Sequence, residues 1–177
     1  SDSYSMNITD KGGNDTFTLK NVSNTYIYSD ATTNSESEKV ETNTYNLTNM
    51  KGVMKIFTNS ENSDKLSVDN YNINYTGTAQ LPNVNIHDYD NGNDTYNIKS
   101  STELKIDDDG GDDKYSFTKS FDTSTFSVTD KSGDDTYSID KVKGIYTLDD
   151  KAGTKDSLIF GDKKANIVFM ADVNDSK

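Results

Sequence analysis

The stretch Asp130-Lys-Ser-Gly133-Asp-Asp135-Thr-Tyr137-Ser-Ile139 joins an acidic glycine turn to an alternating apolar segment. Its second half, an acid or amide followed by two apolar residues at alternate positions, occurs seven times in the chain. A pattern that recurs every 19 to 30 residues is an internal repeat, and repeats of this length are typical of solenoid proteins. The seven copies span residues 15–19, 43–47, 64–68, 94–98, 113–117, 135–139 and 156–160.

A second pattern alternates with the first and places two apolar residues at alternate positions, usually followed by Asp. Side chains of a β-strand point to opposite faces in turn, so each copy of either pattern predicts a strand with one buried face. Each repeat therefore holds two strands, one plain polar corner and one acidic glycine corner. The copies of the second pattern are Met6/Ile8/Asp10, Tyr26/Tyr28/Asp30, Met54/Ile56/Thr58, Val84/Ile86/Asp88, Leu104/Ile106/Asp108, Phe126/Val128/Asp130, Tyr146/Leu148/Asp150 and Val168/Met170/Asp172.

Strands with a single apolar face bury that face by stacking on neighbouring copies. We therefore expect an all-β fold, a right-handed parallel β-solenoid with two strands per coil and six to seven coils, as one domain over residues 1–177. Two segments, Ser29–Thr42 and Asp69–Asn83, interrupt the pattern and are predicted to be loops. Neither end shows a capping element, so we expect a piece of a larger protein.

The composition favours an elongated β structure over a compact globule. Only 31% of the residues are hydrophobic and the mean hydropathy is −0.86, whereas aromatic and β-branched residues favour strands. The net charge is −12, and the 30 acidic residues comprise 25 Asp and 5 Glu. Asp favours turns over helices. All 18 basic residues are Lys, and an acidic chain without Arg argues against nucleic acid as a partner.

The chain contains no Cys, which excludes disulfides, thiolate metal sites and a cysteine nucleophile. No apolar run approaches the length of a membrane span, and no signal-peptide pattern opens the chain. Paired carboxylates leave a polysaccharide lyase or hydrolase as an alternative. These carboxylates recur in a ladder, however, and His87 is the only His and has no nucleophile motif beside it. We therefore expect no enzymatic activity.

The acidic corners are predicted to bind Ca²⁺. Glycine permits backbone torsions that turn carbonyl groups toward a common centre, and stacked coils place carboxylates above one another. Calcium accepts about six to eight oxygen ligands in flexible geometry, whereas magnesium demands a stricter octahedron. The alternative is that Asp, Asn and Gly merely form turns and keep the surface soluble. The predicted metal-site residues are Asp88, Asp90, Asn91, Gly92, Asp94, Asp107, Asp108, Asp109, Gly110, Gly111, Asp113, Asp130, Gly133, Asp135, Asp150, Gly153 and Asp156, together with Asp10, Gly12, Gly13 and Asp15.

Two corners are predicted to be poor sites. The corner that follows Asp10–Asp15 in space, near Thr42–Asn43, lacks the acids, and the corner Thr58–Asp64 has no glycine.

The corners in 10–19, 108–117 and 130–139 resemble the haemolysin-type calcium-binding repeats of RTX proteins, G-G-x-G-x-D followed by an alternating apolar strand. Residues 84–172 match best, and only one corner of each coil carries glycine, so the chain looks like a one-sided relative with one ion column. The resemblance implies a type I-secreted bacterial protein, extracellular or on the cell surface, that folds on calcium outside the cell. S-layer proteins, adhesins and toxins contain such repeats.

Two other roles remain open at this point. A glycan-binding or adhesive module is one, because Tyr71 and Tyr75 in the predicted loop 69–83 could contact host glycans. A surface lattice is the other, in which calcium joins subunits. The expected partners are therefore calcium ions, with lattice subunits or host glycans as further candidates and no nucleic acid or membrane span.

Overall fold

The structure is a computed structural model that describes residues 5–30, 40–58, 67–76, 82–99, 103–118, 124–140, 143–161 and 166–171. Within these residues the chain forms fifteen β-strands and no helix. The strands are β1 (Met6–Asp10), β2 (Thr16–Lys20), β3 (Ser23–Ser29), β4 (Glu41–Thr48), β5 (Lys51–Thr58), β6 (Ser67–Asn74), β7 (Asn83–Asp88), β8 (Thr95–Lys99), β9 (Glu103–Asp108), β10 (Lys114–Thr118), β11 (Thr125–Asp130), β12 (Thr136–Asp140), β13 (Ile145–Asp150), β14 (Ser157–Phe160) and β15 (Asn166–Ala171).

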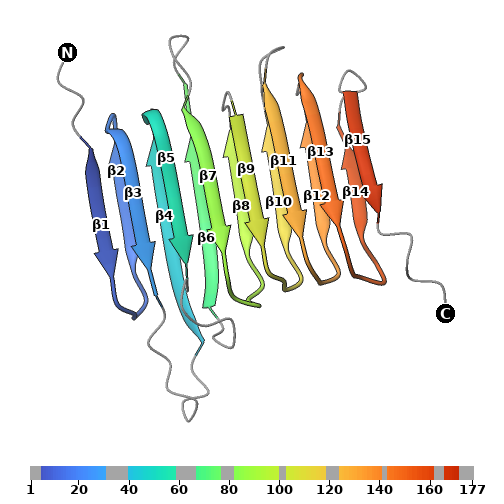
Figure 1. Ribbon diagram of the computed structural model, residues 1–177, viewed down its shortest axis with the longest axis horizontal. Coiled ribbons are helices and arrows are strands. Elements are labelled where there is room, and N and C mark those ends of the chain that lie inside the picture. Colours follow the sequence, from blue (N-terminus) through green and yellow to red (C-terminus); the bar gives the residue numbers. More distant parts are fainter. Residues whose placement is uncertain are drawn as a thin grey trace.

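The strands separate by odd and even number into two parallel sheets. One sheet has the order β1-β3-β5-β7-β9-β11-β13-β15, and the other runs from β2 through the even strands to β14. In Figure 1 the odd strands descend in front and the even strands return behind them while the chain advances from left to right, which is a right-handed path. The predicted parallel β-solenoid with two strands per coil is confirmed.

The core is a thin layer of inward-facing side chains between the two sheets. Its most regular feature is a stack of six aromatic rings on the even strands, with neighbouring ring centroids 4.7 to 5.1 Å apart. This spacing equals the separation of paired strands, about 4.8 Å, so every coil repeats the register of the one before it. The rings are those of Phe17, Tyr45, Tyr71, Tyr96, Tyr115 and Tyr137.

The structure corrects the register of one predicted strand by a single residue. In β3 the buried side chains are Thr25, Ile27 and Ser29, whereas Tyr28 is 41% exposed. The expected inward set Tyr26/Tyr28/Asp30 is therefore wrong. Pairing decides this, because Ile27 lies between Ile8 of β1 and Ile56 of β5 and continues their apolar column.

Two further copies of the repeat also shift. The register pairs Tyr71 with Tyr96, so the true copy in β6 is residues 69–73 and not 64–68. Residues 59–66 lie outside the described part of the chain. In β15 the register pairs Leu148 with Phe169, one residue away from the expected Val168/Met170 alignment, and Asp172 lies outside the described residues.

The two predicted loops are shorter than expected. Glu41 already begins β4, and residues 31–39 lie outside the described part. The first six residues of the predicted loop 69–83 belong instead to β6, and its last residue is the first residue of β7. Tyr71 is fully buried and Tyr75 is 5% exposed, so the prediction that these two residues contact glycans is wrong.

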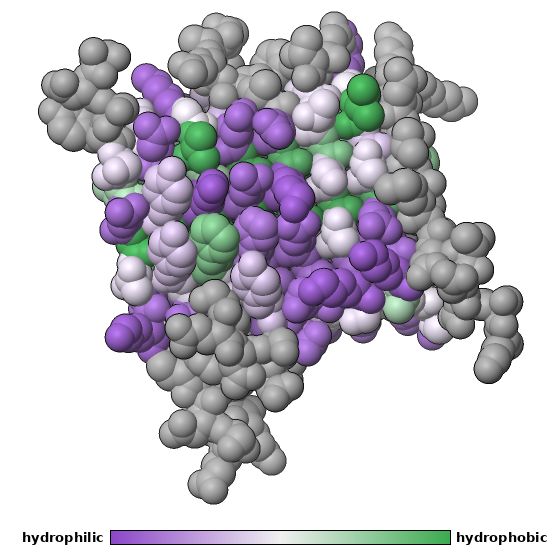
Figure 2. Space-filling model, viewed as in Figure 1, coloured by the Kyte–Doolittle hydropathy of each residue, from purple (hydrophilic) through white to green (hydrophobic). Residues whose placement is uncertain are grey.

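The outer faces of the sheets are polar. Figure 2 shows that the face over the odd strands is mainly hydrophilic, with scattered hydrophobic side chains. Lysines on this surface pair with outward-facing acids, as Lys105 does with Asp107 at 2.6 Å. In the part of the chain that the structure describes, no helix is long and apolar enough to cross a membrane.

Candidate metal centre

Two columns of buried acids face each other at the acidic corner of the solenoid. The strand-end column consists of the Asp residues that end the odd-numbered strands at this corner. The strand-start column consists of the Asp residues at or near the start of the even-numbered strands. The pairing of β9, β11 and β13 aligns Asp108, Asp130 and Asp150, which confirms the predicted vertical alignment of the corners. The strand-end column contains Asp88, Asp108, Asp130 and Asp150, and the strand-start column contains Asp69, Asp94, Asp113, Asp135 and Asp156. All of these except Asp156 are at most 6% exposed.

Backbone amides hold the strand-start column. The amide of Asp69 donates to Oδ1 of Asp94 at 2.6 Å, and the amide of Asp94 donates to Oδ1 of Asp113 at 2.6 Å. The same bond recurs from Asp113 to Asp135 at 2.8 Å and from Asp135 to Asp156 at 3.0 Å. Each carboxylate is thereby fixed through one oxygen, and the Oδ2 atoms of Asp94 and Asp135 are buried without a hydrogen-bond donor.

Core tyrosines hold the strand-end column. The hydroxyl groups of Tyr96 and Tyr115 donate to Oδ2 of Asp108 and Asp130, respectively, each at 2.6 Å. The second oxygen accepts a backbone N–H two residues later, from Gly110 to Asp108 at 3.0 Å. The aromatic stack therefore has two roles, because the same rings that fill the core orient the acids. Tyr71 and Tyr137 make the equivalent bonds to Asp88 at 2.6 Å and to Asp150 at 3.2 Å.

The two columns converge in four clusters of three carboxylates. In each cluster the candidate ligand atoms lie within 4.8 Å of one another. Asp113 and Asp135 each belong to two clusters, so neighbouring clusters share a side chain. The clusters are Asp69/Asp88/Asp90, Asp94/Asp108/Asp113, Asp113/Asp130/Asp135 and Asp135/Asp150/Asp156.

The donor set fits a calcium ion. Calcium–oxygen distances of about 2.3 to 2.6 Å allow oxygens of one coordination sphere to lie up to about 4.6 to 5.2 Å apart, which the clusters satisfy. The Oδ2 atoms of Asp94 and Asp135 are in these clusters' side chains and lack any donor from the protein. Buried polar atoms in folded proteins almost always have a partner, so these two oxygens point to a ligand outside the protein chain.

Burial makes the negative charge of the clusters costly. It raises the pKa of Asp113 and of Asp135 to about 8, with the charge of neighbouring Asp130 adding to the rise at both. Burial also raises the pKa of Asp150 to about 6, with the charge of Asp156 as the next cause. These carboxyl groups ordinarily titrate near 3.8, so ionising them inside the solenoid requires a counter-charge.

The same cause acts at the earlier coils. Burial raises the pKa of Asp69, Asp94 and Asp108 well above the ordinary range, and the charge of Asp88 is the next largest cause at all three. No lysine is buried among the described residues, so no basic side chain of that part neutralises the columns from within. Only a bound cation or a proton can supply the missing charge.

Glycines allow the acidic corners to stack this closely. Gly111 has φ +135° and Gly133 has φ +145°, a region that side chains with a Cβ rarely adopt. A Cβ on Gly111 would lie 1.8 Å from the carbonyl oxygen of Gly92, and one on Gly133 would lie 1.6 Å from that of Gly111. The glycines of the repeat are therefore required by the contact between coils as well as by the turn.

Between Asp88 and Asp156, three residues predicted to offer a side-chain ligand lie outside the clusters. Asp107 faces outward and contacts Lys105 at 2.6 Å and His87 at 3.1 Å. Asp109 pairs with Lys131, and Asn91 is exposed. The alternation of the strand explains Asp107, because its neighbour Asp108 takes the inward position.

The first acidic corner is separate from the four clusters. Its Asp10 accepts a hydrogen bond from the Ser29 hydroxyl at 3.3 Å, and the amide of its Asp15 donates to Oδ1 of Asn43 at 3.1 Å. The amide of Gly13 donates to the Glu41 carboxylate at 3.0 Å, so an acid does lie at the level expected to lack one. Among the described residues, Asp10 and Asp15 join no three-carboxylate cluster. Gly12 and Gly13 have positive φ as the turn requires.

Asp69 is the cluster residue that sequence reasoning missed. It starts Asp69-Asn-Tyr71-Asn-Ile73, which matches the repeat, but an apparent copy at 64–68 precedes it and displaced it into a predicted loop. The distinguishing signal is Tyr71, because tyrosine occupies the same place in the copies with Tyr45, Tyr96, Tyr115 and Tyr137. The structure places Asp69 fully buried beside Asp88 and Asp90.

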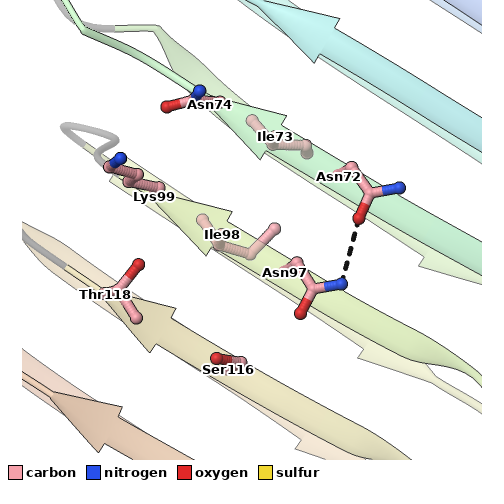
Figure 3. A pocket seen from close by; sticks show the side chains of 8 residues that line it. All are labelled: Asn72, Ile73, Asn74, Asn97, Ile98, Lys99, Ser116 and Thr118. Carbon is pink, nitrogen blue, oxygen red and sulfur yellow. Dashed lines mark hydrogen bonds between the residues drawn. The ribbon is translucent and has the colours of Figure 1, made fainter.

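A groove on the outer face of the even-strand sheet offers little for catalysis. It has a volume of about 350 Å³ and is lined by eight residues, of which Lys99 alone carries an ionisable side chain. Figure 3 shows Asn72 and Asn97 along it, where the Asn97 amide donates to Asn72 at 3.0 Å. The groove lacks the carboxylate pair that glycosidase chemistry uses.

Comparison with known proteins identifies no relative: no family model, no curated protein and no solved structure matches this chain. The assignment of a function therefore depends on the two acidic columns.

Proposed function

We propose that this chain is a calcium-binding β-solenoid module whose folding is coupled to calcium. The observation that carries the proposal is the set of four three-carboxylate clusters, buried except at Asp156, in which Asp69, Asp94 and Asp135 each keep one oxygen without a donor. The clusters combine residues far apart in the sequence, so they exist only in the folded chain. Binding energy at such a site is also folding energy.

Calcium is the cation that this chemistry favours. The clusters offer carboxylate oxygens and no sulfur or imidazole, which suits a hard cation rather than zinc or copper. Magnesium needs near-ideal octahedral geometry and keeps much of its water, whereas calcium accepts irregular oxygen cages. Buried clusters that share side chains between coils are an irregular cage of this kind.

The biological role that we propose is structural and non-enzymatic, as a one-sided RTX-type module of a bacterial protein that a type I system exports to the medium or the cell surface. Its acids recur in a ladder rather than forming a unique constellation, which supports a structural role. A chain of charge −12 repels itself where calcium is scarce, as in the cytosol, and this repulsion keeps its acidic coils extended for export. External calcium then neutralises the columns. S-layer, adhesin and toxin subunits are the parent proteins and lattice partners that fit this role.

Titration of the purified chain with calcium, followed by far-ultraviolet circular dichroism, tests the proposal. We expect only part of the strand signal in EDTA and a cooperative gain at millimolar calcium, because the ions remove the repulsion within the columns. The same concentration of magnesium should restore much less. A chain with full strand signal in EDTA and no increase in thermal stability on adding calcium would leave the acids as turn formers only.

A further inference from the structure

The solenoid contains a block of coils in which the two columns are neutral. At β3 and β5 the strand-end position is taken by Ser29 and Thr58, and at β4 the strand-start position is taken by Asn43. All three side chains are at most 3% exposed. They are hydrogen-bonding groups without charge. Strand β6, which completes the block, brings only Asp69 into the columns, so the block carries less repulsion than the calcium clusters. The inference below rests on the proposed calcium function.

The neutral block is also the best-formed part of the solenoid. Strands β4, β5 and β6 have eight residues each, the longest in the described chain. The pairing of β4 with β6 is continuous over all eight positions, from Glu41 opposite Ser67 to Thr48 opposite Asn74. Its apolar core is fully closed, with Tyr45, Leu47 and Ile56 at 0% exposure. Long strands and a complete core supply stability that needs no ion.

The first calcium cluster lies at the edge of this block and takes its third acid, Asp90, from the turn after Asp88. The turn from Asp88 to Asp94 is one residue longer than the turn from Asp108 to Asp113, and it brings Asp90 into the interior at 0% exposure. Ser67 of β6 holds Asp90 through both its hydroxyl, at 2.6 Å, and its amide, at 3.2 Å. The boundary cluster is thus attached to the neutral block by β6. Its attachment to the neutral block, rather than a larger number of acids, suits this cluster to fill first.

We propose that β3–β6 fold without calcium and serve as the template on which the acidic coils β7–β14 assemble in order, beginning at the boundary cluster. Each coil of a solenoid contacts only its neighbours, so an ordered block lowers the cost of adding the next coil. The ring stack crosses the boundary without a break, with centroid distances of 4.9 Å from Tyr45 to Tyr71 and 4.7 Å from Tyr71 to Tyr96. Shared Asp113 and Asp135 then couple each filled cluster to the next.

Hydrogen exchange of the full chain, in EDTA and in millimolar calcium, tests this template. In EDTA we expect amides of β4–β6 to exchange at least about tenfold more slowly than those of β8–β14, and in calcium we expect the difference to disappear. Slow exchange in β4–β6 under both conditions supports the inference. If calcium protects β7–β14, but in EDTA the amides of β4–β6 exchange as fast as those of β8–β14, the template is refuted and the calcium function stands. If calcium changes exchange nowhere, the calcium function itself fails.

Two variants on β4 make the test specific. Asn43→Asp places a charge in the neutral column, whereas Asn46→Asp places the same charge on the outer face. In each case the native side-chain amide oxygen accepts one hydrogen bond, and a carboxylate can accept the same bond. We expect Asn43→Asp to remove the protection of β4–β6 in EDTA and calcium to restore it, while Asn46→Asp leaves it in place. Equal loss or equal retention in both variants would contradict the role of column neutrality.

Discussion

Asp113→Asn should affect the protein in opposite ways with and without calcium. Asp113 belongs to two clusters, so the change removes one carboxylate from each of two ion sites. The amide oxygen of Asn can still accept the bond that the Asp94 amide donates to Oδ1 at 2.6 Å. The variant therefore removes charge while keeping the hydrogen bond and the volume of the side chain.

The size of the effect follows from the pKa of this group. Burial raises the pKa of Asp113 from its ordinary value of 3.8 to about 8. At pH 7 this group is ionised in the unfolded chain but protonated in the ion-free fold. Keeping it protonated at a pH about 3 units above its ordinary pKa costs about 1.36 kcal/mol for each unit. Without calcium, Asp113→Asn should thus stabilise the fold by at most about 4 kcal/mol. With calcium that gain is offset, because two sites lose a ligand.

Urea unfolding followed by circular dichroism at pH 7, in EDTA and in millimolar calcium, measures both effects. The expected result is that the calcium-dependent increment in unfolding free energy shrinks, by up to about 4 kcal/mol from the gain in EDTA and further from the lost ligands, with higher stability or strand content in EDTA. The matched control is Asp112→Asn on the neighbouring exposed residue, whose Oδ1 accepts the amide of Asp134 at 3.0 Å. A similar loss of stability in both conditions for Asp113→Asn would mean that the carboxylate is only a hydrogen-bond acceptor, and the charge argument would be wrong.

Two further predictions concern pH and the glycine ladder. In EDTA, acidification from pH 8 to pH 5 should increase strand content. The pKa of Asp113 and of Asp135 is about 8 in the folded chain, against an ordinary value of 3.8. The ion-free fold is therefore most stable below pH 3.8 and loses stability as the pH rises toward 8. Circular dichroism in EDTA checks this, and ion-free unfolding on acidification would contradict it. Gly111→Ala should lower the unfolding free energy in calcium by more than about 3 kcal/mol, because φ is +135° and the new Cβ would lie 1.8 Å from the Gly92 carbonyl oxygen. Lys114→Ala, on an exposed side chain of the next strand, is the control, and equal urea midpoints for the two variants would refute the close contact between corners.

The carboxylate clusters were largely predictable where the repeat is regular. In the coils from Asp108 to Asp156 the strands are separated by short acidic corners, so alternate residues could be assigned to the inside and the acids to a common edge. The prediction failed at Asp69 because two consecutive segments, 64–68 and 69–73, both fit the pattern. It also failed at β3, where Thr-Tyr-Ile-Tyr-Ser can bury either its tyrosines or Ile27.

The repeat alone determined that this chain forms stacked parallel strands with acids along one edge, because period-two alternation leaves each strand an apolar face that only another coil can cover. Which register each strand takes was decided by its neighbours, since a one-residue slip exchanges the two faces of a strand and only pairing selects between them. The hydrogen bonds from tyrosines and amides that orient the carboxylates likewise exist only after coils stack. The donorless oxygens of Asp94 and Asp135 are a consequence of that stacking, because their second oxygen is already held by the coil beside them.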